Sequence, residues 1–452
     1  MRFQPRCGLD ATLLRGSNLT ATSFPLIAPR MPLKPRLLRR SVIPGTLLLV
    51  GLAAGLLSDL WFAVDPENPG LRFWPQTIRL AFIAVMCGYT SSHLARLFRL
   101  NIVRFQAVWL LVMIGRLLFQ PDFDRPQALY VAYYTFWIVV FWTVYCMVDC
   151  GRLNVKQVAV VGTLMNALMS SRVLLFIFSG VWIGSPVLNL NLNGRVTDQG
   201  YILLWFTLMQ LAAPIGLVGG MVAVTSMIAV VLTLERGTLI SLLVGLLVYA
   251  TIQAYLVPRH RKRILIWSFS SLAVVGITMW MSADRILARW LDLSNSKTAG
   301  SGRLTFWSEI TNNWVNSDLF TKIFGFGPLS VQNVVGTTAK FAHNDFLEQL
   351  QCFGLLGALL FIGVCCAMLR TCYQLVRNRS GAASVFCAAT AVFISTGLYC
   401  VLSDSMNTVW FSVIAATMLA YAKYPARKAV RRTSGRRFPI YAGPLPAASL
   451  TG

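Results

Sequence analysis

Three polar residues, Arg236, Arg303 and His343, stand out in an otherwise apolar sequence. The guanidinium of an arginine carries its donors in one plane that matches phosphate oxygens, and each charge-assisted hydrogen bond contributes about 1.5–3 kcal/mol. The imidazole of a histidine titrates at about pH 6.5, so it can accept or donate a proton near neutral pH. Two arginines and a histidine that converge could therefore hold a diphosphate and move a proton beside it.

Five further residues are candidates for substrate binding, namely Arg172, Arg195, Trp307, Asn344 and Asp345. Arg172 falls inside a long apolar segment, where a charge is costly and by default suggests a functional site. The Asp345 carboxylate follows closely after His343 and could orient its imidazole or cap the next helix. These side chains become a site only if the fold brings them to one face of the molecule.

Each candidate also has an ordinary structural explanation. An arginine near a membrane surface can extend to lipid head groups or pair with a nearby acid such as Glu235. A histidine at a loop-to-helix junction can be a simple cap or surface residue. Arg172 can mark a span boundary that is displaced by a few residues. The elements that position these residues therefore decide between the two kinds of explanation.

The composition indicates a membrane protein. Hydrophobic residues make up 56% of the 452 residues and charged residues 12%, with a mean hydropathy of +0.63. A soluble domain carries about a quarter charged residues, so its core could not absorb this much apolar surface. The net charge of +24 comes from short basic runs between apolar segments, which argues against a nucleic-acid-binding face. The cysteines lack the paired spacings of a metal or disulfide framework, and we expect no metal and no cofactor.

About twelve segments are apolar and long enough to cross a hydrocarbon core of about 30 Å as helices. They are 43–61, 78–95, 105–120, 128–148, 157–182, 201–216, 217–234, 238–256, 264–281, 347–369, 383–401 and 409–423. The apolar run 201–234 must hold two of them, separated near Pro214 and Gly216, if the chain is to alternate sides. The expected fold class is an all-α polytopic membrane protein with one large loop.

The distribution of Lys and Arg predicts the orientation, because these residues collect in cytoplasmic loops. They occur in alternate loops, at 96–104, 152–156, 259–263 and 370–379. This pattern places both termini in the cytoplasm and the longest loop outside. The expected parts are a basic cytoplasmic tail at 1–42, transmembrane helices at 43–281, a large periplasmic loop at 282–346, transmembrane helices at 347–423 and a basic cytoplasmic tail at 424–452.

Function is expected to concentrate in the loop 282–346, since long loops on a rigid scaffold often carry it. Apolar residues recur there at helical spacing, at Leu304, Trp307, Ile310 and Trp314. This spacing predicts an amphipathic helix that begins at Arg303. We expect the helix to lie along the membrane interface with Trp307 and Trp314 as anchors.

Five short strings follow one another in the second half of the chain. They are Leu-Glu-Arg-Gly at 234–237, Ser-Gly-Arg-Leu-Thr-Phe-Trp at 301–307, Phe-Gly-Phe-Gly-Pro at 324–328, Ala-His-Asn-Asp-Phe-Leu-Glu at 342–348 and Phe-Gly-Leu-Leu-Gly at 353–357. In this order and at these membrane positions, they resemble the O-antigen ligase and polymerase superfamily of bacterial membrane glycosyltransferases. The resemblance extends over residues 201–361.

The resemblance implies a GT-C-like helical fold and a transfer at the outer face of the inner membrane. A glycan would pass from undecaprenyl diphosphate to a saccharide acceptor by a metal-independent, inverting displacement, without a nucleotide sugar. Arg236 and Arg303 would bind the diphosphate, and His343 would act at the reaction centre. Glu235 departs from the pattern, because a small hydroxyl residue is usual there, and its carboxylate could compete with phosphate for Arg236.

Within that superfamily the string at 342–348 and the modest size of the loop favour an O-antigen or exopolysaccharide polymerase. The alternative is a ligase that attaches finished polymer to lipid A-core. A lipid-linked sugar flippase or transporter is the alternative from another class, but acids at span centres and internal repeats, which such proteins commonly have, are not evident. The expected partners are the lipid-linked donor, the saccharide or lipid A-core acceptor and the bilayer, with no nucleic acid.

Overall fold

A computed structural model describes the residues 43–62, 69–120, 124–178, 196–212, 216–233, 235–284, 287, 303–334, 342–399 and 409–422. The predictions for the two tails and for Arg195 lie outside these residues. The helices are α1 (Ile43–Phe62), α2 (Pro69–Ser91), α3 (Leu94–Leu97), α4 (Asn101–Leu118), α5 (Arg125–Asp149), α6 (Val155–Phe178), α7 (Val196–Ala212), α8 (Gly216–Leu232), α9 (Arg236–Leu256), η3 (Pro258–His260), α10 (Arg261–Met281), α12 (Arg303–Val315), α13 (Leu319–Phe324), α14 (Val331–Val334), α15 (Asp345–Arg377) and α16 (Ala383–Tyr399). A last helix is formed by Val409–Ala422.

The described residues form an all-helical structure, as the sequence predicts, and a helix occupies each of the predicted spans. Six helices are long and apolar enough to cross a membrane, and further apolar helices are shorter. The apolar run 201–234 divides into α7, which ends at Ala212, and α8, which begins at Gly216. The protein is therefore a multi-pass membrane protein, and the crossing of the bilayer by all of these helices stays a prediction.

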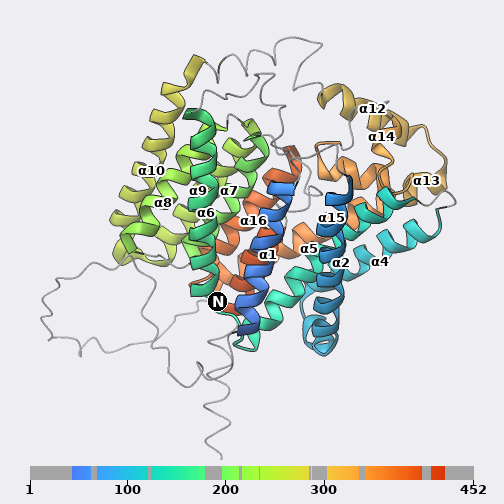
Figure 1. The fold of residues 1–452 in the computed structure, drawn as a ribbon, viewed down its shortest axis with the longest axis horizontal. Coiled ribbons are helices and arrows are strands. Elements are labelled where there is room, and N and C mark those ends of the chain that lie inside the picture. The colour runs from blue at the N-terminus through green and yellow to red at the C-terminus, as the bar shows by residue number, and fades with distance from the viewer. Residues whose placement is uncertain are drawn as a thin grey trace, which may run out of the picture.

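Aromatic side chains fill the centre of the bundle. Trp109, Trp137, Trp205 and Trp410 are all fully buried. The rings of Phe393 and Phe411 stack with centroids 4.2 Å apart. Figure 1 shows α8 and α10 at one side of the bundle, α2 and α4 at the other, and α5 and α16 between them. Since α10 leaves most of its apolar side chains exposed while α5 buries most of its own, α10 provides lipid-facing surface and α5 provides core.

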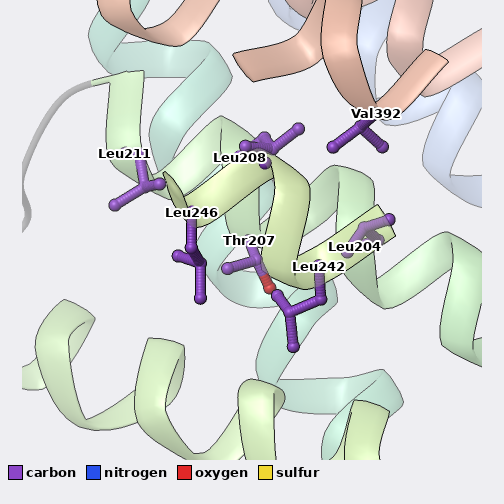
Figure 2. Close-up of a pocket in the computed structure, with 8 residues that line it drawn as sticks. Leu204, Thr207, Leu208, Leu211, Leu242, Leu246 and Val392 are labelled. Atoms are coloured by element: carbon purple, nitrogen blue, oxygen red, sulfur yellow. The ribbon is translucent and has the colours of Figure 1, made fainter. Parts of the chain in front are cut away.

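Polar contacts join the helices inside this apolar core. The amide of Asn166 in α6 donates to Gln210 in α7 at 2.9 Å and accepts from Ser226 in α8 at 2.6 Å. In the bundle interior such hydrogen bonds satisfy groups that lipid cannot satisfy. Nearby, a small apolar pocket lies between α7, α9 and α16 (Figure 2), lined by Leu204, Thr207, Leu208, Leu211, Leu242, Gly245, Leu246 and Val392.

One end of the bundle collects the loops that the charge pattern places in the cytoplasm. Thr46, at the start of α1, accepts a hydrogen bond from Gln157, near the start of α6, at 2.8 Å. Arg96 in α3 forms an ion pair with Asp149, the last residue of α5, at 3.5 Å. The N-terminal end of α1, the α3 segment and the junction of α5 with α6 therefore lie together, in agreement with the predicted alternation of sides.

The opposite end collects loops that the same pattern places outside. At this end Tyr130, near the start of α5, donates a hydrogen bond to Glu348 in α15 at 3.0 Å. Arg116, near the end of α4, binds the carbonyl of Gly325. The two ends are separated by the length of α5, which is about 37 Å at 1.5 Å per residue and so exceeds the hydrocarbon thickness. Which end faces the periplasm stays a prediction.

The predicted span 347–369 is not one continuous helix, because α15 breaks at Gly354. This residue has φ 64° and ψ −164°, a conformation essentially reserved for glycine. A Cβ on Gly354 would lie 2.4 Å from the carbonyl of Ile323, and a Cβ on Gly325 would lie 2.4 Å from the carbonyl of Cys352. The two glycines therefore allow the backbone of 323–325 to touch that of 352–354. The break at this contact divides α15 into a short first part and a long second part.

Candidate functional site

The amphipathic helix predicted after Arg303 is α12, and its two tryptophans form hydrogen bonds within the large loop, while their role as membrane anchors stays a prediction. The indole N–H of Trp307 donates to the carbonyl of Ala342 at 2.9 Å, and that of Trp314 donates to the carbonyl of Lys322 at 3.1 Å. An indole N–H finds a partner when it is buried, and here the nearest acceptors are backbone groups of the same loop. Both tryptophans therefore hold the loop together. Exposed apolar side chains lie on α13, at Leu319, Phe320, Ile323 and Phe324, and on α12, at Leu304 and Val315.

Helix α13 begins at a side-chain cap. Asp318 accepts hydrogen bonds from the backbone N–H of Thr321 at 3.0 Å and from its hydroxyl at 2.6 Å. These hydrogen bonds favour the ionised carboxylate and lower the pKa of Asp318. The helix ends at Gly325, which has φ 77°. The cap and the glycine together fix where the chain turns back under α12 toward α15.

His343 occupies a strained backbone conformation immediately before α15. Its φ is 53°, in the left-handed region, which few residues other than glycine adopt. Strain of this kind costs about 1–3 kcal/mol and persists only where the surroundings impose it. The imidazole is half-buried. A strained, half-buried histidine at the end of the large loop agrees with the functional role predicted for it, which stays a prediction.

The residues on either side of His343 are both fixed. Ala342 is buried, its N–H donates to Glu348 at 2.7 Å, and its carbonyl accepts from Trp307. The side chain of Asn344 accepts from the backbone N–H groups of residues 346 and 347 at 3.0 and 3.2 Å. Asn344 is therefore the N-cap of α15, and the alternative that Asp345 caps this helix is wrong, because Asp345 is already its first helical residue.

Behind His343 lies a buried polar cluster that includes a carboxylate. Glu348 is fully buried, and one of its oxygens accepts from the Tyr130 hydroxyl at 3.0 Å and lies 3.8 Å from the Cys352 thiol. The Tyr130 hydroxyl also lies 3.5 Å from that of Tyr134. Asp345, 1% exposed, belongs to the same turn of α15. A buried carboxylate persists only when donors satisfy it, and α5 supplies one of those donors.

The glycine turn at 325–327 packs against the other side of this cluster. The N–H of Phe326 donates to the carbonyl of Gln351 at 2.9 Å, and the N–H of Gly327 donates to that of Cys352 at 3.0 Å. Arg116 donates to the carbonyl of Gly325 at 3.1 Å through Nη2. The predicted turn therefore holds the first part of α15 against α4, and it satisfies carbonyls that the break at Gly354 leaves open.

Arg236 and Arg303 each begin a helix. Arg303 is the first residue of α12, one turn before Trp307, the residue that binds the carbonyl of Ala342. Arg236 is the first residue of α9. A helix N-terminus carries unpaired N–H groups and a partial positive charge, both of which favour an anion.

The packing of α9 against α16 places Arg236 at the same end of the bundle as His343. Ser384, near the start of α16, donates to Gln253 near the end of α9, and Ser395, near the end of α16, donates to Ser241 near the start of α9. The two helices are therefore antiparallel. Since α16 returns from α15 through a short turn, the starts of α9 and α15 face the same side.

Glu235 has a partner of its own beside Arg236. The hydroxyl of Tyr201 in α7 donates to the Glu235 carboxylate at 3.4 Å. Glu235 is the N-cap residue of α9, but its side chain makes no capping hydrogen bond. The hairpin is tightly packed, because a Cβ on Gly200 would lie 2.8 Å from the hydroxyl of Thr233. The sequence identified Glu235 as a competitor for Arg236, but it gave no sign of Tyr201.

The remaining candidates are less closely tied to this centre. Arg172 lies in α6, about 26 Å along the helix from its first residue, which places it in the half nearer to His343. It is half-exposed. Arg195 lies outside the described residues. Within the described part of the chain, no three His, Cys, Asp or Glu side chains are grouped to hold a metal ion.

Sequence reasoning missed Tyr130 and Cys352, assigned no role to Glu348, and noted Arg116 only as a charge within a predicted span. All four lie inside predicted spans, where a tyrosine or cysteine passes as a packing residue. The one available signal was Arg116, a charge near the end of an apolar segment. The position of Glu348 beside a predicted catalytic histidine was visible, but its partner Tyr130 is 218 positions away in the sequence.

Two comparisons with known proteins bear on this centre. Residues 221–362 match a family model whose description is O-antigen ligase. The matched segment runs from α8 to the second part of α15, and so includes the starts of α9 and α12 together with His343 and Glu348. A comparison with curated proteins found no match.

Proposed function

From the O-antigen ligase family domain that residues 221–362 form, we propose that the protein is a membrane glycosyltransferase. The donor is a glycan on undecaprenyl diphosphate, and the acceptor is a saccharide. The reaction takes place at the end of the bundle that carries α12–α14, which faces the periplasm. The glycan donor, the acceptor and the lipid bilayer are the partners of the protein.

One observation supports the proposal more than any other. The start of α9, the start of α12 and the strained His343 lie at the same end of the bundle, and all three fall within the matched segment 221–362. Arg236 and Arg303 are the first residues of their helices, where the helix dipole adds to the charge of the side chain. Two such positions at the same end of the bundle as a histidine suit a diphosphate leaving group.

In the proposed reaction the acceptor hydroxyl oxygen attacks the anomeric carbon of the donor sugar. The bond from that carbon to the diphosphate oxygen breaks, and its electron pair stays on the diphosphate. Arg236 and Arg303 stabilise the charge that develops there. His343 accepts the hydroxyl proton, or it hydrogen-bonds to the leaving oxygen while the departing diphosphate takes up that proton, and attack from the opposite side inverts the anomeric configuration. Since a diphosphate leaves readily, positioning supplies much of the rate.

The remaining candidates surround this centre in the proposal. Asn344 caps the helix that follows His343, Asp345 lies buried in the first turn of that helix, and Trp307 ties α12 to the residue before His343. Arg172 and Arg195 bind the donor along its path to the centre. The polymerase is the favoured activity and the ligase the alternative.

Reconstitution with a defined donor tests the proposal. The purified protein in proteoliposomes should transfer glycan from undecaprenyl diphosphate, and Arg303→Ala or His343→Ala should abolish transfer while the protein still accumulates. Arg370→Ala provides the matched control, because Arg370 is an exposed arginine in the cytoplasmic half of α15. Full activity of Arg303→Ala would remove this residue from the mechanism.

The lipid-linked intermediates of a deletion strain separate the candidate activities. Single repeat units on undecaprenyl diphosphate at the outer face indicate a polymerase. Full-length lipid-linked polymer indicates a ligase. Units that remain at the cytoplasmic face indicate a flippase, which would contradict the proposed transfer reaction.

A further inference from the structure

Glu348 lies one helical turn into α15, and its side chain reaches back past the start of the helix. One carboxylate oxygen accepts from the N–H of Ala342 at 2.7 Å, and the other accepts from the Tyr130 hydroxyl at 3.0 Å. The carboxylate therefore bridges α5 to the last residue of the loop before His343. Glu348 is fully buried, so none of its surface reaches solvent.

We propose that Glu348 is a positioning residue for the transfer reaction: by fixing the N–H of Ala342, it holds His343 in its working conformation. The inference rests on the proposed function, because it presupposes that His343 acts at the reaction centre. It assigns to Glu348 no contact with substrate.

The backbone around His343 gives the reason. Ala342 is held at both polar groups, by Glu348 at its N–H and by Trp307 at its carbonyl, and Asn344 is held by its capping bonds to α15. His343 lies between these two fixed residues, and its φ is 53°. A left-handed residue relaxes to negative φ when its neighbours are released, and the imidazole then moves with it.

The hydrogen bond from Trp307 to the carbonyl of Ala342 links the residue that Glu348 fixes to α12, the helix that begins at Arg303. Trp307 and Arg303 are one turn apart in α12, so the carbonyl of Ala342 fixes that helix relative to the same backbone residue that Glu348 fixes. A shift of Ala342 would change the separation between the histidine and the arginine of the proposed centre. Errors of about 1 Å in such a separation can cost about a hundredfold in rate.

The occupancy of its oxygens argues that Glu348 acts through His343 and not on the substrate directly. Both oxygens already accept from protein donors, and the Cys352 thiol lies 3.8 Å from one of them. Tyr130 fixes the carboxylate from the side of α5. A general base, by contrast, needs an oxygen within reach of the acceptor proton.

Backbone hydrogen exchange tests whether Glu348 fixes the N–H of Ala342, and this measurement needs no substrate. In the purified full-length protein, Glu348→Leu should accelerate amide exchange in a peptide that covers residues 342–347. Glu348→Gln should exchange nearly as slowly as the wild type, because its carbonyl oxygen still accepts from Ala342 while its amide donates to the Tyr130 oxygen. Gln106→Met is the matched control, since it removes a buried hydrogen bond of 2.9 Å to Trp142 between α4 and α5.

Transfer kinetics test whether loss of this hydrogen bond slows the reaction at His343. The donor is undecaprenyl-diphosphate-linked glycan isolated from the deletion strain. Glu348→Leu should lower kcat about a hundredfold and leave the KM for the donor nearly unchanged. Glu348→Gln should restore kcat to within about tenfold of the wild type, and Gln106→Met should match the wild type. If Glu348→Leu does not accumulate, Glu348→Ala, which also removes the acceptor for the N–H of Ala342, takes its place, and Tyr130→Phe, which leaves that hydrogen bond intact, is its control.

Two results would overturn the inference. Glu348→Gln could lose transfer completely while residues 342–347 keep their slow exchange, which would show that the carboxylate acts by its charge or as a base. Slow exchange and full turnover in Glu348→Leu would show that Ala342 needs no anchor. Absence of transfer in the wild-type protein would contradict the proposed function, and the exchange data would still decide whether Glu348 fixes the loop.

Discussion

At the scale of single residues, the structure explains how a histidine can be held in an unfavourable conformation. Both neighbours of His343 are fixed, through the N–H and the carbonyl of Ala342 and through the side chain of Asn344. The free energy of these hydrogen bonds offsets the strain at φ 53°. A sequence shows that a histidine precedes a helix, but it does not show that both flanking residues are fixed.

Tyr201 is expected to keep Glu235 from competing with phosphate for Arg236. Its hydroxyl donates to the Glu235 carboxylate at 3.4 Å. In Tyr201→Phe the carboxylate loses this donor, so the KM for the lipid diphosphate donor should rise about threefold while kcat stays nearly constant, as expected for loss of one weak hydrogen bond. Steady-state kinetics in proteoliposomes give both constants.

The double variant Tyr201→Phe, Glu235→Ser is the control for that prediction. Removal of the carboxylate should return the KM to the wild-type value, since no competitor remains for the tyrosine to hold. A KM that stays raised in the double variant would show that Tyr201 acts on the packing of the hairpin and not through Glu235.

At the scale of helices, hydrogen bonds to backbone groups hold the large loop together. Trp307 and Trp314 donate to carbonyls of the same loop, and the turn at 325–327 donates to carbonyls of the first part of α15. The prediction of a helix that begins at Arg303 is confirmed, and the anchoring of its tryptophans at the membrane interface stays a prediction. Helical spacing shows which residues share a face, and only the packing of α13 and α15 decides what that face contacts.

The break in α15 should depend on the absence of a side chain at Gly354. In Gly354→Ala the added Cβ would meet the carbonyl of Ile323 at 2.4 Å, in a conformation that alanine itself disfavours. We expect a loss of about 2 kcal/mol or more in the free energy of unfolding. A thermal-stability assay of the detergent-solubilised protein should show a lower Tm.

Gly220→Ala is the matched control for this substitution. Gly220 lies in helix α8, is exposed, and has nothing within 4 Å of an added Cβ. Alanine favours helix more than glycine does, so the Tm should stay the same or rise slightly. A Tm for Gly354→Ala equal to that of the control would mean that the two backbones do not touch at Gly325 and Gly354.

At the scale of the whole molecule, contacts between distant helices agree with the sides that the charge pattern assigns. The bond from Gln157 to Thr46 and the ion pair of Arg96 with Asp149 join loops assigned to the cytoplasm. The bonds at Glu348 and Gly325 join segments assigned to the outside. The positions of Lys and Arg along the chain and the packing of the helices therefore assign the same loops to the same end of the bundle.

Reporter fusions should give the orientation of this arrangement. Alkaline phosphatase folds only in the periplasm, so a fusion after Asp284, which follows α10, should be active. A fusion after Arg379, in the short turn between α15 and α16, should be inactive. The reverse pattern would place the proposed active site in the cytoplasm, where a periplasmic transfer reaction is impossible.

The sequence by itself determined the long apolar helices and their approximate limits. The mean hydropathy of about 20 consecutive residues is a local property, and it decides whether a segment can cross the hydrocarbon core as a helix. It also placed α7 and α8 as separate helices, since Pro214 and Gly216 interrupt the apolar run. It identified the residues of the matched segment whose types suit a diphosphate.

Only the tertiary structure decided how those residues are held. The left-handed conformation of His343, the capping role of Asn344, and the break at Gly354 against Gly325 all depend on groups that meet after the helices have packed. Tyr130 reaches Glu348 across 218 positions of sequence. Such contacts leave no periodic pattern, because hydrogen bonds between distant helices are specified by packing geometry and not by neighbouring residues.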